Sequence, residues 1–420
     1  MGAATDKTAA TVGKQGGGLS EWFRKRFPWD QLMEDHVTGY YAPKNFNWWY
    51  VFGSLALFAL IIQIVSGIWL TMMYKPSAEE AFSSVEYIMR DVEWGWLLRY
   101  MHSTGASLFF VVVYIHMFRA LLYGSYQKPR ELIWIFGMLI YIVMCAEAFF
   151  GYLLPWGQMS YWGAQVIVSL FGALPVIGEP LVEWIRGDYF ISDVTLNRFF
   201  ALHVIALPLV LLGLVVAHIL ALHEVGSNNP DGVEIKDHKG PDGKPLDGIP
   251  FHPYHTAKDV PAWVLFAMVF AAIVFFAPEA GGLFLEHANF EPADPLRTPD
   301  HIAPVWYFTP FYAILRAVPD KLGGVLLMGA AMFVLFLLPW LDRSPVRSIR
   351  YKGPLFKIAL ALFVVSFVAL GWLGLQPATG LYTMLARVFT IIYFAFFILM
   401  PFYSKIDKTR TPPERITYHG

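Results

Sequence analysis

Two segments decide the fold of this chain: YMHSTGASLFFVVVYIHMF at Tyr100–Phe118 and FFALHVIALPLVLLGLVVAHILALH at Phe199–His223. Neither contains Asp, Glu, Lys or Arg, and each is about as long as the 20 apolar residues that an α-helix needs to cross a bilayer. Each also carries two histidines inside its apolar run, namely His102 and His116, and His203 and His218. A polar side chain at membrane depth is costly, so these four residues are candidate functional residues.

The composition of the whole chain agrees with a membrane protein. Of its 420 residues 56% are hydrophobic and only 15% are charged, whereas soluble domains carry roughly 25% charged residues. The single cysteine, Cys145, excludes a disulfide framework, a cysteine-ligated iron–sulfur cluster and a CxxCH haem attachment. The net charge of −1 gives no indication of a nucleic-acid partner.

Eight mostly apolar runs, of which only the third (Glu147) and the eighth (Arg387) contain a charged residue, predict an all-α integral membrane fold with eight transmembrane helices. They are Asn45–Tyr74, Tyr100–Phe118, Leu132 to about Leu153, Phe199–His223, Val260–Pro278, Leu322–Leu341, Ile358 to about Leu375, and about Ala378–Met400. The glycine-rich stretch Pro155–Gly178 is predicted to form short helices on the membrane surface, and a ninth span is the alternative.

Eight spans place both termini on one side of the membrane. Under this topology most of the 31 lysines and arginines lie on the terminal side, so the positive-inside rule places both termini in the cytoplasm. The polar first residues predict no cleavable signal peptide.

The spacing of the histidines indicates what they bind. Fourteen residues turn about 1400°, which is about 40° short of four turns, so His102 and His116 share a helix face and lie about 21 Å apart. With one span between them the two histidine-bearing helices run parallel, so their histidines meet at two depths. Two cross-helix pairs suit two haems, each with an imidazole on both sides of its iron. Because both axial positions of the iron are then filled, no site remains there for oxygen or substrate, and the expected chemistry is electron transfer. A lone buried histidine would more often be an ordinary core residue, and a ninth span would make the two helices antiparallel.

Two further patterns support haem binding. Glycines recur with the same period of fourteen, at Gly53 and Gly67 and at Gly137 and Gly151, where a missing side chain would let a flat macrocycle approach the backbone. Basic residues lie where haem propionates would emerge: Arg99 and Arg198 at one face, and Arg119 at the other. Ordinary membrane-helix glycines and snorkelling arginines are the alternative readings.

Longer motifs around these residues closely resemble the cytochrome b subunit of bacterial ubiquinol–cytochrome c oxidoreductase, respiratory complex III, from about Trp29 to Tyr403. The motifs are GYLLPWGQMS at Gly151–Ser160, HEVGSNNP at His223–Pro230, FHPY at Phe251–Tyr254 with Lys258 and Asp259, and YAILR at Tyr312–Arg316.

The resemblance implies two non-covalent haems b, two quinone sites, ubiquinone or ubiquinol as the substrate, and a location in the bacterial inner membrane. It assigns His102 and His203 to a low-potential haem near the periplasm, and His116 and His218 to a high-potential haem near the cytoplasm. It implies a periplasmic quinol-oxidising site with Tyr152, Gly163, Pro304, Tyr307 and Phe308. It implies a cytoplasmic quinone-reducing site with His223, Ser227, Lys258 and Asp259. The implied partners are a Rieske-type iron–sulfur protein, a c-type cytochrome, a second copy of the complex in a homodimer, and membrane lipids.

The predicted organisation has five parts. These are a cytoplasmic N-terminal segment (1–44), the four-helix haem-binding bundle with periplasmic surface helices (45–223), a cytoplasmic loop (224–259), a C-terminal four-helix region with the periplasmic quinol-site loop (260–402) and a cytoplasmic tail (403–420).

The sequence departs from the family pattern at a catalytic position. Family members often carry Pro-Glu-Trp-Tyr, in which the glutamate is thought to accept a quinol proton, whereas this chain has Val305 within Pro304–Tyr307. Glu147, five residues before Tyr152, is a carboxyl group inside a predicted span. We hypothesise that Glu147 takes the proton role together with Tyr152 and Tyr307; a protonated glutamate that only packs against a neighbouring helix is the alternative.

A second departure is the fifteen-residue spacing of His203 and His218, where respiratory relatives usually have fourteen and the split photosynthetic relatives have fifteen. Pro208 is predicted to allow a local wide turn that absorbs the extra residue.

Two rival functions remain open from the sequence. One is a proton-coupled transporter, for which inverted repeats and broken helices are expected. The other is the cytochrome b of a photosynthetic quinol oxidoreductase, against which the unsplit chain argues.

Overall fold

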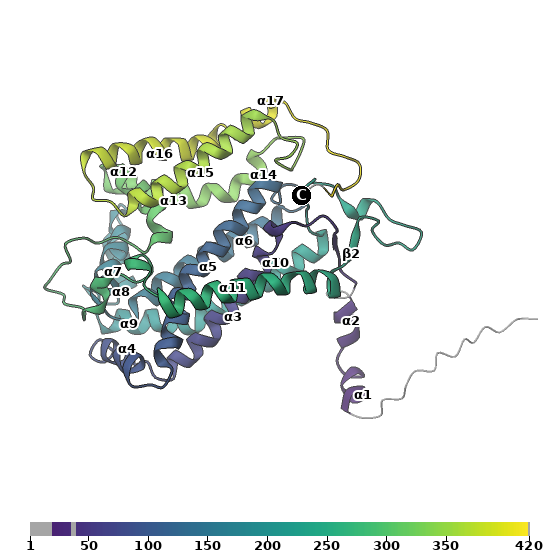
Figure 1. Cartoon of the computed structure of the whole chain (residues 1–420). Coiled ribbons are helices and arrows are strands. Elements are labelled where there is room, and N and C mark those ends of the chain that lie inside the picture. Colours follow the sequence, from purple (N-terminus) through teal and green to yellow (C-terminus); the bar gives the residue numbers. More distant parts are fainter. Residues whose placement is uncertain (1–18, 35–38, 419–420) are drawn as a thin grey trace, which may run out of the picture.

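The computed structural model describes residues 19–34 and 39–418, and the chain is almost entirely helical (Figure 1). Part of the expected N-terminal segment (1–18 and 35–38) and the last two residues lie outside the described ranges. Within those ranges, eight helical segments are long and apolar enough to cross a membrane. This confirms the eight predicted spans, and Pro155–Gly178 is not among them.

The spans correspond to the following helices. They are α3 (Phe52–Thr71) preceded by η2 (Trp48–Tyr50), α5 (Gly95–Tyr123), α6 (Glu131–Leu153), α9 (Asp193–Ala201) with η4 (Leu202–Ala206) and α10 (Leu207–Val225), η6 (Phe251–His255) with α11 (Thr256–Phe276), α13 (Lys321–Phe333) with η10 (Val334–Leu337) and α14 (Leu338–Leu341), α15 (Pro354–Gly374), and α16 (Gly380–Ile398).

Shorter elements connect the spans. They are α1 (Leu19–Arg24), α2 (Trp29–Met33), α4 (Ala81–Arg90), α7 (Gln158–Leu170), η3 (Phe171–Ala173), α8 (Gly178–Arg186), α12 (Thr309–Ala317), α17 (Met400–Ile406), and the strands β1 (Tyr41–Pro43) and β2 (Gly248–Pro250). The 13 residues of α7 are too few to cross a bilayer, so the stretch expected on the membrane surface forms α7 and η3 and leads into α8.

The spans pack in two groups. In the first group α3 packs on α5 and α6 packs on α10, while α11 lies against α3 and α5. In the second group α15 packs between α12 and α16, and α13 packs on α12. Figure 1 shows α15 and α16 as an upper layer over α5 and α6.

The connecting elements collect at the two ends of the helices. In Figure 1, α4, α7 and α8 lie at one end, whereas α2, β2, α17 and the C-terminal tail lie at the other. There β1 pairs antiparallel with β2, with Tyr41 opposite Pro250, and so ties the N-terminal segment to the loop after α10. Both described ends of the chain are therefore on the same side, as an even number of spans requires.

The helix that carries His203 and His218 contains one wide turn. The segment Leu202–Ala206 is a π-helix between the α-helices α9 and α10. Pro208 has no N–H to donate to the Val204 carbonyl four residues earlier, so the α-helical bonding pattern is open at this point. A π turn takes up one more residue than an α turn. The predicted wide turn near Pro208 is thus confirmed, and it absorbs the extra residue of the fifteen-residue spacing.

The fifth span begins earlier than Val260, where its uncharged run begins. Helix α11 starts at Thr256, after the short turn η6, and includes Lys258 and Asp259 in its first turns. An acidic side chain in the first turn of a helix is stabilised by the unpaired N–H groups there, so a charged residue does not end this helix.

Candidate functional site

Two pairs of histidines meet inside the first group of helices, at two depths along α5. The ring centres of His102 and His203 are 6.1 Å apart, and the rings are inclined at 88°. The ring centres of His116 and His218 are 6.4 Å apart, and the rings are inclined at 66°. Two imidazoles that bind one metal ion from opposite sides, each at about 2 Å, have ring centres roughly 6 Å apart. Both pairs therefore fit an iron between them.

The Nδ1 atoms of three of these rings already have acceptors in the protein. His203 Nδ1 bonds the Glu147 carbonyl at 2.9 Å, His218 Nδ1 bonds the Ile133 carbonyl at 2.9 Å, and His102 Nδ1 bonds the Ser66 hydroxyl at 3.0 Å. An imidazole that donates Nδ1–H to the protein keeps Nε2 for a metal, and its orientation is fixed. This is the arrangement expected of axial ligands.

The fourth histidine has a basic neighbour instead. Arg119 Nη2 is 3.4 Å from His116 Nδ1, and Arg119 Cζ is 4.9 Å from the centre of the Tyr50 ring. Arg119 Nε is buried and has no hydrogen-bond partner among the described residues. Because a guanidinium group only donates, this unused donor fits a carboxylate of a bound macrocycle, which is the role that the sequence predicts for Arg119.

Each predicted glycine lies beside one of the histidines. A Cβ added at Gly53 would lie 3.3 Å from His116 Cε1, and one at Gly67 would lie 3.1 Å from His102 Cε1. The other two glycines, Gly137 and Gly151, adjoin His218 and His203 in the same way. The missing side chains thus make room for the imidazole edges, whereas the sequence argument assigned that room to the macrocycle.

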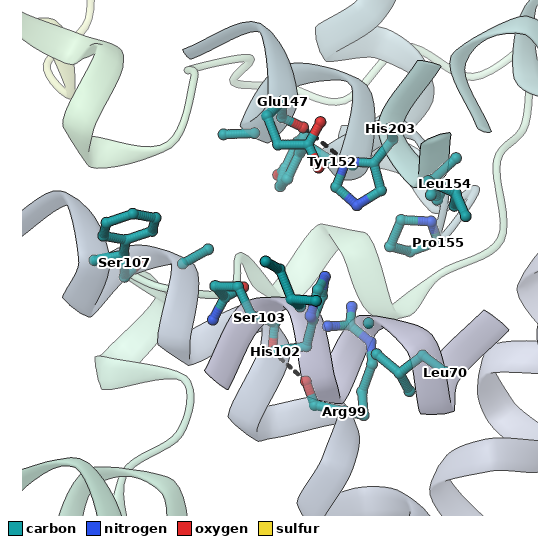
Figure 2. Close-up of a pocket in the computed structure, with 18 of the residues that line it drawn as sticks. Leu70, Arg99, His102, Ser103, Ser107, Glu147, Tyr152, Leu154, Pro155 and His203 are labelled. Carbon is teal, nitrogen blue, oxygen red and sulfur yellow. Dashed lines mark hydrogen bonds and ion pairs between the residues drawn. The ribbon is translucent and has the colours of Figure 1, made fainter. Parts of the chain in front are cut away.

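A cavity of about 270 Å³ surrounds the first histidine pair (Figure 2). Figure 2 shows His102 and His203 on opposite sides of this space. Its other predicted lining residues are Arg99, Gly67, Glu147, Gly151, Tyr152 and Tyr307. Arg198 does not line it: this side chain is exposed and donates to the Trp184 carbonyl of α8 at 2.6 Å. Arg198 is therefore held on the surface by α8, away from the cavity that Arg99 lines.

At one edge of the cavity a tyrosine and a glutamate form a close pair. The Tyr152 hydroxyl donates to Glu286 Oε2 at 2.5 Å. Glu286 lies in the loop between α11 and α12, and burial raises its pKa to about 7, against the bond from Tyr152, which lowers it. Glu286 lines a second cavity of about 260 Å³, together with Arg99 and with Glu86 and Arg90 of α4.

Glu286 was missed in the sequence. The only signal is an acidic residue directly after the apolar run Leu283–Leu285, and nothing local distinguishes it from the other acidic residues of this loop. Its partner Tyr152 is 134 residues away in the chain, so only the folded structure shows the pair.

Glu147, the acid predicted from the sequence, faces the His203 ring. Glu147 Oε1 is 3.1 Å from His203 Nδ1, and Glu147 Oε2 is buried without a hydrogen-bond partner among the described residues. The structure therefore holds two carboxyl groups near the first histidine pair, one against the His203 ring and one against Tyr152.

The remaining predicted quinol-site residues adjoin this region. The Tyr307 ring stacks on Phe110 with 3.8 Å between centres, and its carbonyl accepts from the Tyr114 hydroxyl at 2.6 Å. A Cβ on Gly163 would contact the Tyr152 ring at 3.8 Å. Pro304 and Phe308 flank Val305 and Tyr307 in the chain but are not among the cavity-lining residues.

The predicted quinone-reducing residues lie at the opposite end of the helices. His223, near the end of α10, stacks on Tyr40, and the Ser227 hydroxyl is 3.0 Å from the Tyr40 hydroxyl. Lys258 and Asp259, in the first turns of α11, instead contact the segment before α3 and the first turn of α3 itself. Lys258 Nζ donates to the Phe46 carbonyl at 2.8 Å, and Asp259 bonds the Ser54 side chain.

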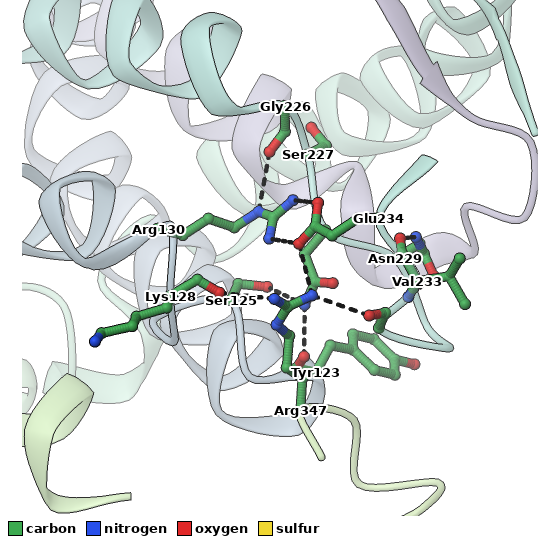
Figure 3. Close-up of polar contacts among 12 residues, drawn as sticks. Tyr123, Ser125, Lys128, Arg130, Gly226, Ser227, Asn229, Val233, Glu234 and Arg347 are labelled. Atoms are coloured by element: carbon green, nitrogen blue, oxygen red, sulfur yellow. Dashed lines mark hydrogen bonds and ion pairs between the residues drawn. The ribbon is translucent and has the colours of Figure 1, made fainter. Parts of the chain in front are cut away.

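A buried ion-pair network supports the turn that carries Ser227 (Figure 3). Arg130 Nε donates to the Gly226 carbonyl at 2.9 Å, and its two terminal nitrogens bind both Glu234 oxygens at 2.6 and 2.8 Å. Arg347 joins the same carboxylate at 2.6 Å. The Arg130 side chain is 2% exposed, so three loops are held together at one buried point.

Comparisons with known proteins agree with this architecture. Residues 37–226 match the family described as Cytochrome b/b6/petB, and residues 292–394 match Cytochrome b(C-terminal)/b6/petD. The chain is 64% identical to the cytochrome b of Allochromatium vinosum, over 94% of this chain and 97% of that protein. It is 49% identical to the cytochrome b of Rhodospirillum rubrum, over 94% and 95%.

A solved structure has the same fold. A chain of a hyperthermophilic respiratory complex III superposes with a TM-score of 0.85 at 41% identity, covering 93% of this chain and all of that one. From the two family matches, the relatives and the shared fold, the chain belongs to the cytochrome b family.

Proposed function

We propose that this chain is the haem-carrying membrane subunit of a respiratory quinol–cytochrome c oxidoreductase. The observation that carries the proposal is the two cross-helix histidine pairs, with ring centres 6.1 and 6.4 Å apart and with most Nδ1 atoms bonded to the protein. His102 with His203, and His116 with His218, would hold two haems b, and Arg99 and Arg119 would neutralise their propionates. When bound, these groups supply one-electron transfer between the two membrane faces.

Quinol is oxidised, in this proposal, beside Tyr152 and Tyr307. Oxidation of a quinol releases two electrons and two protons, so the site needs a base for a hydroxyl proton. We assign this role first to the Glu286 carboxylate, with Tyr152 beside it, because Glu286 also opens onto the second cavity. That cavity is lined by the Glu86 and Arg90 ion pair, so a proton accepted by Glu286 has a polar route outward.

Glu147 remains the second candidate for the same role. Its Oε2 is buried without a partner, which suits a group that takes up a proton, but its Oε1 is directed at His203. A carboxyl group that contacts an axial ligand is suited to setting the basicity of that ligand, and this favours such a role for Glu147. The two carboxyl groups therefore make different predictions when each is replaced by glutamine.

Quinone is reduced at the opposite face, beside His223 and Ser227. Reduction consumes two protons, so the carbonyl oxygens need donors that can be resupplied from solvent. His223 would donate a hydrogen bond to a quinone oxygen, and Lys258 and Asp259 would relay protons or hold a lipid phosphate. We place both termini in the cytoplasm, the quinone-reducing site at the cytoplasmic face of the membrane, and the quinol-oxidising site at the periplasmic face.

The chain cannot complete the reaction by itself. One electron from quinol needs an acceptor outside the membrane core, and a Rieske-type iron–sulfur protein and a c-type cytochrome would supply this path, in a dimer of the complex. Membranes carrying His102→Leu or His218→Leu test the proposal by quinol–cytochrome c activity and haem content. Each variant is expected to lose one haem and more than 100-fold in activity; full activity in either would overturn the assignment.

A further inference from the structure

Tyr40 occupies a fixed position at the cytoplasmic end of the predicted quinone-reducing region. It directly precedes β1, and its carbonyl accepts a hydrogen bond of 2.8 Å from the Phe251 N–H, just after β2. The Tyr40 side chain is 7% exposed. The short β1–β2 ladder therefore sets where this phenol ring lies.

The ring of Tyr40 covers one face of His223. The two ring centres are 4.3 Å apart and the planes are inclined at 21°. Stacking of this kind contacts the face of an imidazole, whereas its two nitrogens lie at the edge. Tyr40 thus fixes the plane of the His223 ring through a contact that uses neither nitrogen.

The hydroxyl of Tyr40 makes two contacts with Ser227. The Ser227 backbone N–H donates to the Tyr40 oxygen at 3.2 Å, and the two side-chain oxygens are 3.0 Å apart. The phenol oxygen already accepts a hydrogen bond from the Ser227 N–H. The simplest hydrogen-bond pattern that satisfies both side chains therefore has the Tyr40 hydroxyl donating its hydrogen to Ser227 Oγ. The Ser227 hydroxyl hydrogen then remains available for a ligand.

The environment keeps this phenol in its neutral form. Burial raises the pKa of Tyr40, and the bonds from Ser227 oppose this only in part. A neutral phenol retains the hydrogen that the bond to Ser227 Oγ requires.

We propose, on the basis of the proposed function, that Tyr40 is a positioning residue of the quinone-reducing site. It orients the His223 ring edge and the Ser227 hydroxyl as two donors for the carbonyl oxygens of one quinone. Tyr40 itself touches neither the quinone nor the reacting atoms. Its loss is therefore expected to weaken quinone binding more than it slows the chemical step.

Two substitutions separate the two contacts. Tyr40→Phe keeps the stacked ring and removes the hydroxyl, and Tyr40→Leu removes both. Tyr41→Phe, in the adjacent strand position, is the matched control. The measurement is reoxidation of the pre-reduced purified complex by a short-chain ubiquinone, analysed for kcat and for KM at the quinone-reducing site. Quinol oxidation in a single turnover is measured alongside it on each variant.

The proposal predicts a KM effect that grows with the truncation. Tyr40→Phe should raise KM about five-fold and Tyr40→Leu about 30-fold or more, with kcat changed less than about two-fold. Tyr41→Phe should match the wild type, and single-turnover quinol oxidation should be unchanged in all three. An unchanged KM in Tyr40→Phe, or equal losses of kcat at both quinone sites, would overturn the proposal.

Failure of the proposed function would look different. If the wild-type protein is not reoxidised by quinone at all, the proposed function is wrong, and the Tyr40 inference falls with it. If the wild type is reoxidised and both Tyr40 variants keep its KM, only the positioning role is wrong. Should Tyr40→Leu fail to accumulate, Tyr40→Phe, which preserves the ring, decides the question.

Discussion

The Tyr152 hydroxyl and the Glu286 carboxylate are joined by a hydrogen bond of 2.5 Å at the junction of two adjoining cavities. Tyr152 lines the cavity around His102 and His203, whereas Glu286 lines the cavity beside α4. A proton taken up on the first side of this pair can thus be released on the second. The family resemblance implies a glutamate at the position of Val305, and Glu286 supplies a carboxyl group in the same loop.

Replacement of Glu286 by glutamine is expected to slow quinol oxidation about 100-fold, because a positioned general base contributes roughly that much. Glutamine keeps the shape and can still accept the Tyr152 hydrogen bond, so haem binding should be unaffected. The measurement is the single-turnover rate of quinol oxidation in the purified complex. A rate within two-fold of the wild type would contradict the role of Glu286.

The pH dependence provides an independent check on the same residue. Only the ionised carboxylate accepts a proton, and the pKa of Glu286 is raised to about 7 by burial. The wild-type rate should therefore increase as pH rises through about 7 and then level off, and Glu286→Gln should lack this step. Glu147→Gln is the matched control: it should keep the step and shift the potential of the low-potential haem. Loss of the step in Glu147→Gln alone would return the proton role to Glu147.

The wide turn at Leu202–Ala206 predicts that one residue can be removed from this helix. Deletion of Ala206 would turn the π segment into regular α-helix and leave the direction of His218 nearly unchanged, so both haems should be retained. The matched deletion of Val112 between His102 and His116, where α5 has no such turn, would rotate His116 by about 100°. Haem content of both purified variants checks this, and equal haem loss in the two would contradict it.

The network of Arg130, Glu234 and Arg347 is expected to stabilise the loops that follow α5, α10 and α14. Glu234→Ala leaves the buried Arg130 guanidinium without its carboxylate and should cost about 3 kcal/mol. Burial alone would raise the pKa of Glu234, but the bonds from Arg130 lower it below its ordinary value. The stabilisation should thus be complete at neutral pH and be lost as pH falls below about 4.

Thermal unfolding of the detergent-solubilised protein measures this difference. Asp237→Ala, an exposed substitution in the same loop, is the control and should change little. If Glu234→Ala and Asp237→Ala melt at the same temperature at neutral pH, the network is not stabilising.

Local sequence patterns predict much of this molecule. Mostly apolar runs of about 20 residues indicate the eight spans, although the uncharged stretch Pro155–Gly178 forms none, and the fifteen-residue spacing with Pro208 indicates the wide turn. The period of the histidines predicts that His102 faces His203 because helix geometry links residues on one face over a known rise. These features depend on one helix at a time, or on two helices whose relative direction the topology fixes.

Contacts between distant loops could not be predicted in this way. Glu286 meets Tyr152, and Tyr40 meets His223 and Ser227, through loop paths that no periodicity determines. The contact of Arg198 was also not predictable: this residue, five positions before His203, donates to the Trp184 carbonyl of α8.

The most direct test of the account is a redox titration of the purified protein followed by its reduced-minus-oxidised visible spectrum. Two histidine pairs that each hold a haem b predict a b-type spectrum with two reduction steps of different potential. They also predict two haems per chain in a quantitative haem assay. A spectrum without a haem band, or a single step with one haem per chain, would contradict the central claim.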